Sequence, residues 1–232
     1  NPLTLARDKQ LEEAARSVRS SEATSQPNLK FLALMTMKNP AFAEPQIRDA
    51  IRKSPGDETL HNLLALCRLE LGALGAARAE WLLQVARGIQ SPDIQNNLGV
   101  VLYLKGRQSE AIEMFETSYK GAPDREGLVN LAVLSLKSRN GTLGKTYFQE
   151  LIKQDQERFK SLAQIGLGVA SLQNRQFDSA KDAIGKAHED FPNDPFTLLA
   201  LGYFFMDIEQ DKEAATRILS TCAQRFPSEP RP

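Results

Sequence analysis

The sequence predicts an all-α solenoid of about six helix-turn-helix repeats, and three observations support this prediction. First, a leucine followed by a small residue recurs along the chain at spacings of 34, 33, 36 and 34 residues. Second, each pair is followed by a small and then a large residue, at the spacing of a second helix. Third, proline closes most of the copies. The pairs are Leu64-Ala65, Leu98-Gly99, Leu131-Ala132, Leu167-Gly168 and Leu201-Gly202.

The copy at residues 92–124 shows what each position does. Gly99 lets the second helix approach the first, and Gly106 permits the tight turn between them. Ala111 leaves room where the two helices cross, and Phe115 fills the space toward the next unit. We therefore expect two packed helices in every copy.

This order of residues resembles the tetratricopeptide repeat, over about residues 28–227 with five good copies and one degraded copy. The resemblance implies a right-handed superhelix whose first helices line a concave wall, where extended peptides or helices bind. The size of the array is similar to that of bacterial pilotin-type and gliding-motility tetratricopeptide proteins. This similarity in size favours the periplasmic side of a bacterial envelope over the cytoplasm as the location of the protein. The sequence itself does not assign a compartment.

The chain divides into four parts in order. Residues 1–26 carry an amphipathic stripe and then a polar break, and we interpret them as a cap, with a flexible arm or a cut repeat as alternatives. Residues 27–57 form a degenerate first repeat, whose second helix is expected to begin near Pro45. Five repeats occupy residues 58–228, and residues 229–232 are a tail.

Two further predictions concern the connection at residues 154–160 and the start of the chain. The 36-residue spacing predicts extra residues in the connection at 154–160. The chain begins at Asn1 without methionine or a signal-like segment, so we expect a mature or trimmed form.

Composition narrows the kinds of partner. The 232 residues are 41% hydrophobic and 25% charged, with 29 basic and 29 acidic side chains. Nucleic-acid binders normally carry a basic excess, so this balance argues against a nucleic-acid partner. No apolar run has the length of a membrane span, which argues against direct membrane insertion.

We identify no catalytic, metal or cofactor site, so the prediction is a protein that is not an enzyme. The two cysteines and two histidines are scattered, whereas a metal site needs a cluster. The segment Gly141–Thr146 suggests a phosphate-binding loop, but Arg139 stands where that loop requires its first glycine.

The candidate binding site lies on the first helix of each repeat. With the repeat leucine as reference, the positions −2, +2 and +5 share a face that differs from the packing face. At +2 and +5 this face is apolar or aromatic in every copy, which indicates either a packed inner wall or an apolar trough for a partner segment. The candidate residues are Leu66, Leu69, Asn96, Asn97, Val100, Tyr103, Asn130, Val133, Leu136, Val169, Leu172 and Tyr203.

The resemblance adds a role for two of these residues. Asn97 and Asn130 precede the repeat leucine in adjacent copies, where related arrays use stacked asparagines to clamp a ligand backbone. Asn62, Asn96 and Val129 stand where binders of acidic chaperone tails need lysine, so that class of partner is disfavoured.

The expected function is a non-enzymatic scaffold that binds an apolar or amphipathic segment of a protein partner, in assembly of a bacterial envelope machine. The alternative is a fragment of a larger scaffold or enzyme whose groove is filled by its own chain. The last helix carries Ile218, Leu219 and Cys222 with no helix after it, so we also expect this end to be covered by missing residues, by self-association or by a partner.

Overall fold

The computed structural model describes residues 29–122, 126–154 and 157–227, and within them every regular element is an α-helix. The predicted cap at residues 1–26 and the tail at 229–232 lie outside the described residues. The helices are α2 Leu29–Lys38, α3 Pro40–Lys53, α4 Glu58–Glu70, α5 Leu74–Ala86, α6 Pro92–Leu104, α7 Gln108–Gly121, α8 Glu126–Lys137, α9 Gly141–Lys153, α10 Glu157–Gln173, α11 Phe177–Asp190, α12 Pro195–Asp207 and α13 Lys212–Arg225. The all-α solenoid of about six repeats is confirmed.

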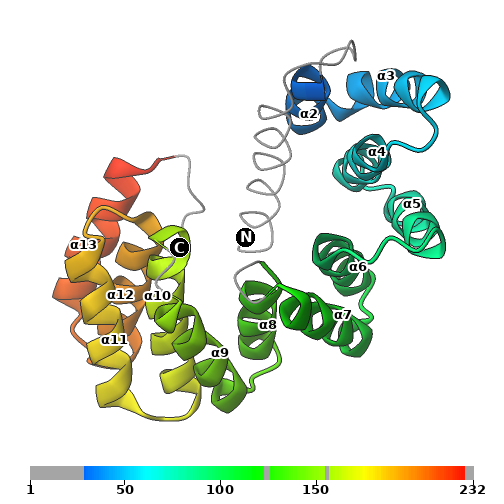
Figure 1. Ribbon diagram of the computed structural model, residues 1–232. Coiled ribbons are helices and arrows are strands. Elements are labelled where there is room, and N and C mark those ends of the chain that lie inside the picture. Colours follow the sequence, from blue (N-terminus) through cyan, green and yellow to red (C-terminus); the bar gives the residue numbers. More distant parts are fainter. Residues whose placement is uncertain (1–28, 123–125, 155–156, 228–232) are drawn as a thin grey trace. The chain divides into compact units, whose positions relative to one another are not determined.

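The chain forms two compact units, which are described separately. The amino-terminal unit runs to Gly127 and holds α2–α7, and the carboxyl-terminal unit starts at Leu128 and holds α9–α13. The helix α8 begins in the first unit and continues into the second. Within the units, α4 packs on α5, α6 on α7, α10 on α11 and α12 on α13 (Figure 1).

The small residues of the repeat allow this close packing of helix pairs. A Cβ atom added at Gly99 would lie 2.6 Å from the Phe115 ring. At Gly168 it would lie 2.5 Å from Ile184, and at Gly202 it would lie 2.5 Å from Leu219. Real Cβ atoms do not approach other atoms so closely, so each glycine is required by the large side chain opposite it. In both units the small residue after the repeat leucine thus packs against the large residue of the second helix in its own repeat, whereas the sequence predicted that Phe115 would fill the space toward the next unit.

The turn inside each of the five repeats from α4 to α13 uses one residue in the left-handed backbone conformation. In the amino-terminal unit this residue is glycine, with φ of 74° at Gly72 and 76° at Gly106. In the carboxyl-terminal unit it is Arg139 at 54°, Arg175 at 57° and Gln210 at 57°. In four of these turns the next backbone N–H donates to the carbonyl five residues earlier, which closes the first helix. These bonds are Ala73 to Arg68, Arg107 to Leu102, Asn140 to Ser135 and Gln176 to Ser171.

Each unit has a buried core built from neighbouring helices. In the first unit, α2, α3 and α4 contribute Leu32, Ala33, Ala43, Ile47, Leu60, Leu63, Leu64 and Cys67. In the second unit, Ala180, Ile184 and Phe204 are joined by partly buried Leu172, Leu201 and Ile208, which connects α10, α11 and α12. No described helix is both long enough and apolar enough to cross a membrane.

Two predicted details of the helices were wrong. The second helix of the first repeat begins at Pro40 instead of near Pro45, because the Asn39 side chain caps it by accepting from the Phe42 N–H at 3.2 Å. Pro45 is exposed and lies inside α3. The segment from Glu157 to Lys160, expected in a connection, instead forms the start of the 17-residue helix α10, and this added turn buries Phe159.

Candidate functional site

In the amino-terminal unit, the candidate face on α4 and α6 is covered by other parts of the chain. The exposed fraction is 1% for Leu66, 6% for Leu69 and 8% for Val100. Asn96 and Asn97 are also buried, and Tyr103 is half-buried. Leu66, Leu69 and Val100 on this face therefore already have most of the stabilisation that burial provides.

In the carboxyl-terminal unit, the same face becomes more open along the repeats. On α8, Asn130 and Val133 are buried and Leu136 is half-buried. On α10, Val169 and Leu172 are half-buried. On α12, Tyr203 keeps 39% of its surface exposed. Equivalent positions in successive repeats are therefore exposed to solvent to different degrees.

The open part of this face includes two residues that the predicted site left out. Phe196 is 44% exposed and Met206 is 39% exposed, and both lie on α12 with Tyr203. Together with half-buried Leu199, these residues follow spacings of three, four and three, which places them on one side of the helix. We call Phe196, Leu199, Tyr203 and Met206 the α12 stripe. Met206 occupies the +5 position, which the candidate face already includes, and extending the register by one turn to −5 finds Phe196.

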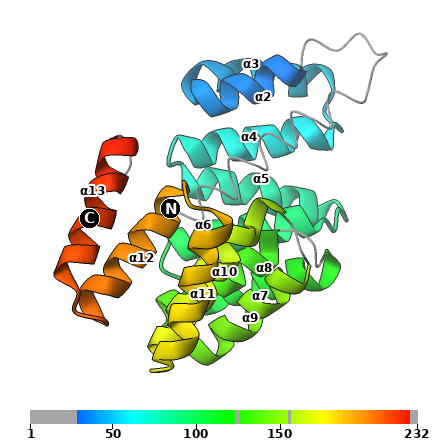
Figure 2. The same ribbon diagram turned by 90° about the vertical axis from the view of Figure 1, so that its left-hand side faces the viewer.

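The α12 stripe lies on a helix with very few charges. From Pro195 to Asp207 the only charged side chain is that of Asp207, at the carboxyl end. The opposite side of α12 contributes Phe204 and Leu201 to the core that it shares with α10 and α11. Figure 2 shows α12 beside α13, the last helix pair of this unit. A helix that is apolar on its outer side as well as its core side has a surface suited to a partner.

The candidate residue Leu172, and Asn62 at another position of the same face, have structural roles in this chain. Leu172 packs against the core of Ala180, Ile184 and Phe204. Asn62, at the −2 position of α4, accepts a 2.8 Å hydrogen bond from the indole N–H of Trp81. That bond explains an asparagine on this face without a ligand, because a buried indole N–H needs an acceptor.

The two asparagines proposed as a clamp are closed off from solvent. Asn97 lies on α6 in the first unit, and Asn130 lies on α8 in the second. Both are almost completely buried. A ligand backbone would reach either amide only after the covering side chains had moved.

The segment that suggested a phosphate-binding loop is part of α9. Lys145 donates to the side-chain carbonyl of Gln176 at 2.8 Å, and Thr146 donates to the Thr142 carbonyl at 3.2 Å. A Cβ added at Gly144 would lie 3.1 Å from Leu136, so this glycine belongs to a helix crossing. Among the described residues, no three His, Cys, Asp or Glu side chains are grouped to hold a metal ion.

Comparisons with known proteins agree with this geometry. The tetratricopeptide repeat family model matches residues 28–92. Among curated proteins, no sequence matches this chain. A solved tetratricopeptide repeat protein from Parabacteroides merdae has a TM-score of 0.68 at 15% identity, covering 97% of this chain and 81% of its own.

Two further solved structures share the fold. PilF from Pseudomonas aeruginosa has a TM-score of 0.68 at 17% identity, covering 99% of this chain and 96% of its own. YrrB, described as a tetratricopeptide protein with an unusual peptide-binding site, has a TM-score of 0.58 at 17% identity, covering 79% of this chain and 93% of its own. At these identities the likeness concerns the fold.

Proposed function

This chain is a tetratricopeptide repeat protein, and from that premise we propose that it is a non-enzymatic scaffold that binds a partner segment on the α12 stripe. The fold is one that supports protein–protein interaction in general. The proposal adds where on this chain the partner binds and what kind of segment the partner contributes. The partner contributes an apolar or amphipathic segment, which lies along α12 and reaches toward the half-buried residues of α10.

The observation that carries the proposal is the exposure of the α12 stripe. Tyr203 and Met206 are each 39% exposed, whereas the equivalent residues on α4, Leu66 and Leu69, are nearly inaccessible. Covering an exposed apolar side chain contributes about 25 cal/mol per Å² of buried surface before the costs of association are subtracted. Aromatic residues and methionine are also enriched at protein interfaces.

The absence of charge on the stripe favours one kind of partner segment. Because none of the four stripe residues is charged, an acidic or basic tail would leave its charges without partners there. An amphipathic helix can lay its apolar side on such a surface, with its polar side in water. An extended segment with alternating apolar residues fits the same stripe.

A role in assembling a bacterial envelope machine remains part of the proposal. Its support is the size of the array and the likeness in fold to PilF over nearly the whole of both chains. For the amino-terminal unit, the burial of Leu66, Leu69 and Val100 favours the alternative in which the chain fills its own groove.

Self-association at the carboxyl end is less well supported by α13 itself. Ile218 and Leu219 are half-buried and Cys222 is buried. The exposed residues of α13 are polar, charged or alanine. A second copy would therefore find more apolar surface on the α12 stripe than on this last helix.

Site-specific photocrosslinking tests the proposal. A photoreactive amino acid at Tyr203 should crosslink a protein partner in cells of the source organism, and the double variant Tyr203→Glu, Met206→Glu should lose that partner in affinity capture. The matched control is Phe177, an exposed aromatic residue at the start of α11, which is not part of the stripe. Equal crosslinking from positions 203 and 177, or full capture by the double variant, would contradict the proposal.

A further inference from the structure

The first two described helices, α2 and α3, carry an apolar surface that faces solvent. On α2, Phe31 is 39% exposed and Leu34 is 43% exposed, and on α3, Phe42 is 49% exposed. The Phe31 and Phe42 rings meet edge to face with their centroids 6.5 Å apart, so the surface is continuous across the two helices. Pro45, three residues after Phe42 on α3, is also exposed. We call Phe31, Leu34, Phe42 and Pro45 the α2–α3 face.

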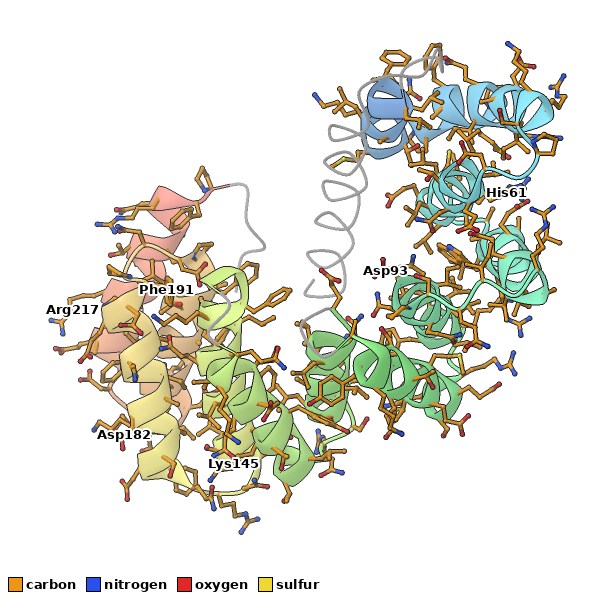
Figure 3. All side chains as sticks on the ribbon, in the orientation of Figure 1. His61, Asp93, Lys145, Asp182, Phe191 and Arg217 are labelled. Carbon is orange, nitrogen blue, oxygen red and sulfur yellow. The ribbon has the colours of Figure 1, made fainter. Side chains whose placement is uncertain are left out.

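This face lies on the side of α2 that is turned away from the core. Leu32 and Ala33 are buried in the core that α2 shares with α3 and α4. At about 100° per residue, Leu34 lies about 200° around the helix from Leu32, and Phe31 lies the same angle from Ala33. Figure 3 shows α4, which carries the labelled His61, next to the α2–α3 pair on its core side.

The first helices inside the unit expose far less of their surface. Only Glu58 is exposed in α4, and only Leu104 is exposed in α6, each at an end of its helix. In both cases the preceding helices cover the chain, since α2 and α3 contact α4, and α5 contacts α6. In the described part of the chain, no helix pair precedes α2. The end of a solenoid normally needs a capping element with a polar outer side.

The chain directly before α2 contains a segment whose chemistry fits this face. Residues 3–19, which lie outside the described residues, carry Leu11, Ala14, Ala15 and Val18 at the spacing of one side of a helix. From Arg7 to Arg19 every other residue is charged or polar. A single helix of this length is marginal in water and gains its stability by packing its apolar side against another surface.

The size of the side chains and the length of the connection also fit. The two alanines at the centre of the stripe leave room for the aromatic rings of the face, as Gly99 leaves room for Phe115 inside the unit. The eight residues 20–27 can span about 26 Å, whereas the ten residues of α2 are about 15 Å long. The segment can therefore reach the whole face, and its attachment to α2 gives it a high effective concentration there.

We propose that residues 3–19 pack as an amphipathic helix on the α2–α3 face, with Leu11, Ala14, Ala15 and Val18 against Phe31, Leu34 and Phe42. The charged side of the segment then faces water and forms the polar end of the solenoid. The predicted cap thus has a defined contact surface in its own unit. This contact is separate from the α12 stripe in the other unit, and its test does not depend on the partner proposed there.

Photocrosslinking within the purified full chain tests this contact. With p-benzoylphenylalanine in place of Leu34, we expect a crosslink to the tryptic peptide Gln10–Arg16. Chains with and without ¹⁵N label are mixed in urea and refolded together, so a contact within one chain joins only peptides of equal label. Crosslinks that join labelled to unlabelled peptides would show that a second copy covers the face, and they would overturn the proposal. The absence of any crosslink to this peptide would also overturn it.

Controls in the same unit and in the segment make the test specific. Leu82 on α5 is 39% exposed and lies outside the face, so the same probe there should not reach Gln10–Arg16. Leu11→Glu places a charge in the apolar contact and should lower the crosslink from position 34 by about threefold or more. Gln10→Glu adds the same charge one residue earlier, off the stripe, and should leave the crosslink unchanged. Equal crosslinking from positions 34 and 82, or a Leu11→Glu chain that crosslinks like the wild type, would contradict the proposal.

Discussion

In α4, the side chains two and five residues after the repeat leucine are almost fully buried, whereas their equivalents in α12 keep about two-fifths of their surface. The two helices follow the same sequence pattern and belong to different units. The turns differ as well, because glycine occupies the left-handed position after α4 and α6, and arginine after α8 and α10. One repeat pattern therefore supports a closed face with relaxed turns in one unit and a more open face with strained turns in the other.

The largest expected effect comes from placing a charge on each version of the face. Leu66→Asp removes a buried side chain, which costs about 1.5–3 kcal/mol, and leaves an unpaired carboxylate in an apolar environment. We expect the free energy of unfolding to fall by about 3 kcal/mol or more. Urea denaturation followed by circular dichroism measures this loss.

The matched variant for that comparison is Tyr203→Asp on α12. Since Tyr203 is well exposed, the free energy of unfolding should fall by about 1 kcal/mol or less. Equal losses in the two variants would mean that the exposed fractions do not describe how firmly the two faces are covered.

A smaller effect is expected at the helix crossings. Gly99→Ala forces a methyl group into the Phe115 ring, which is fully buried, so overpacking should cost about 1–3 kcal/mol. Gly202→Ala meets Leu219, which is only half-buried, so its side chain can move aside and the loss should be smaller. Thermal unfolding of the two variants gives the order.

Gly185→Ala is the control for these crossings. No atom lies within 4 Å of a Cβ placed at Gly185 on α11, so only the gain in helix propensity, about 1 kcal/mol, should remain. A loss of stability in this control would show that steric contact is not what separates Gly99 from Gly202.

The smallest effect is expected in the turns. Arg139→Gly relieves a left-handed conformation that costs a side-chain-bearing residue about 1–2 kcal/mol, partly offset by the greater freedom of glycine in the unfolded chain. We expect a net gain of about 0.5 kcal/mol. Gly106→Ala should act in the opposite direction, with a loss of about 1 kcal/mol. Differential scanning calorimetry resolves both changes, and a stabilising Gly106→Ala would contradict this interpretation of the turns.

The sequence predicted the repeat geometry well, because the pattern records contacts within a helix pair. The small residue at Gly168 and the large residue at Ile184 belong to one crossing, so their spacing reports the packing directly. The start of α3 was less accessible to prediction. Both Pro40 and Pro45 suit the first turn of a helix, and the decision depends on the cap that Asn39 provides.

The exposure of the candidate face could not be predicted from the repeat pattern. The register places Leu69, Leu172 and Met206 at the same angle on their helices, but burial depends on what other parts of the chain cover each one. The role of Asn62 was hidden for a related reason. Its partner Trp81 lies on α5, and only the packed pair of helices brings the amide to the indole.

Each unit contains one buried free thiol, so the rate at which that thiol is alkylated reports how often the unit opens. Cys67 lies in the first unit, 3.0 Å from the Pro40 carbonyl, and Cys222 lies in the second, 3.7 Å from the Pro195 carbonyl. Burial, aided by the nearby charge of Glu44, raises the pKa of Cys67 to about 11, so its reactive thiolate is scarce at neutral pH. An alkylating reagent therefore modifies a cysteine mainly while its surroundings are open. Mass spectrometry of the two cysteine peptides would time the opening of each unit separately, in one sample and without any introduced label.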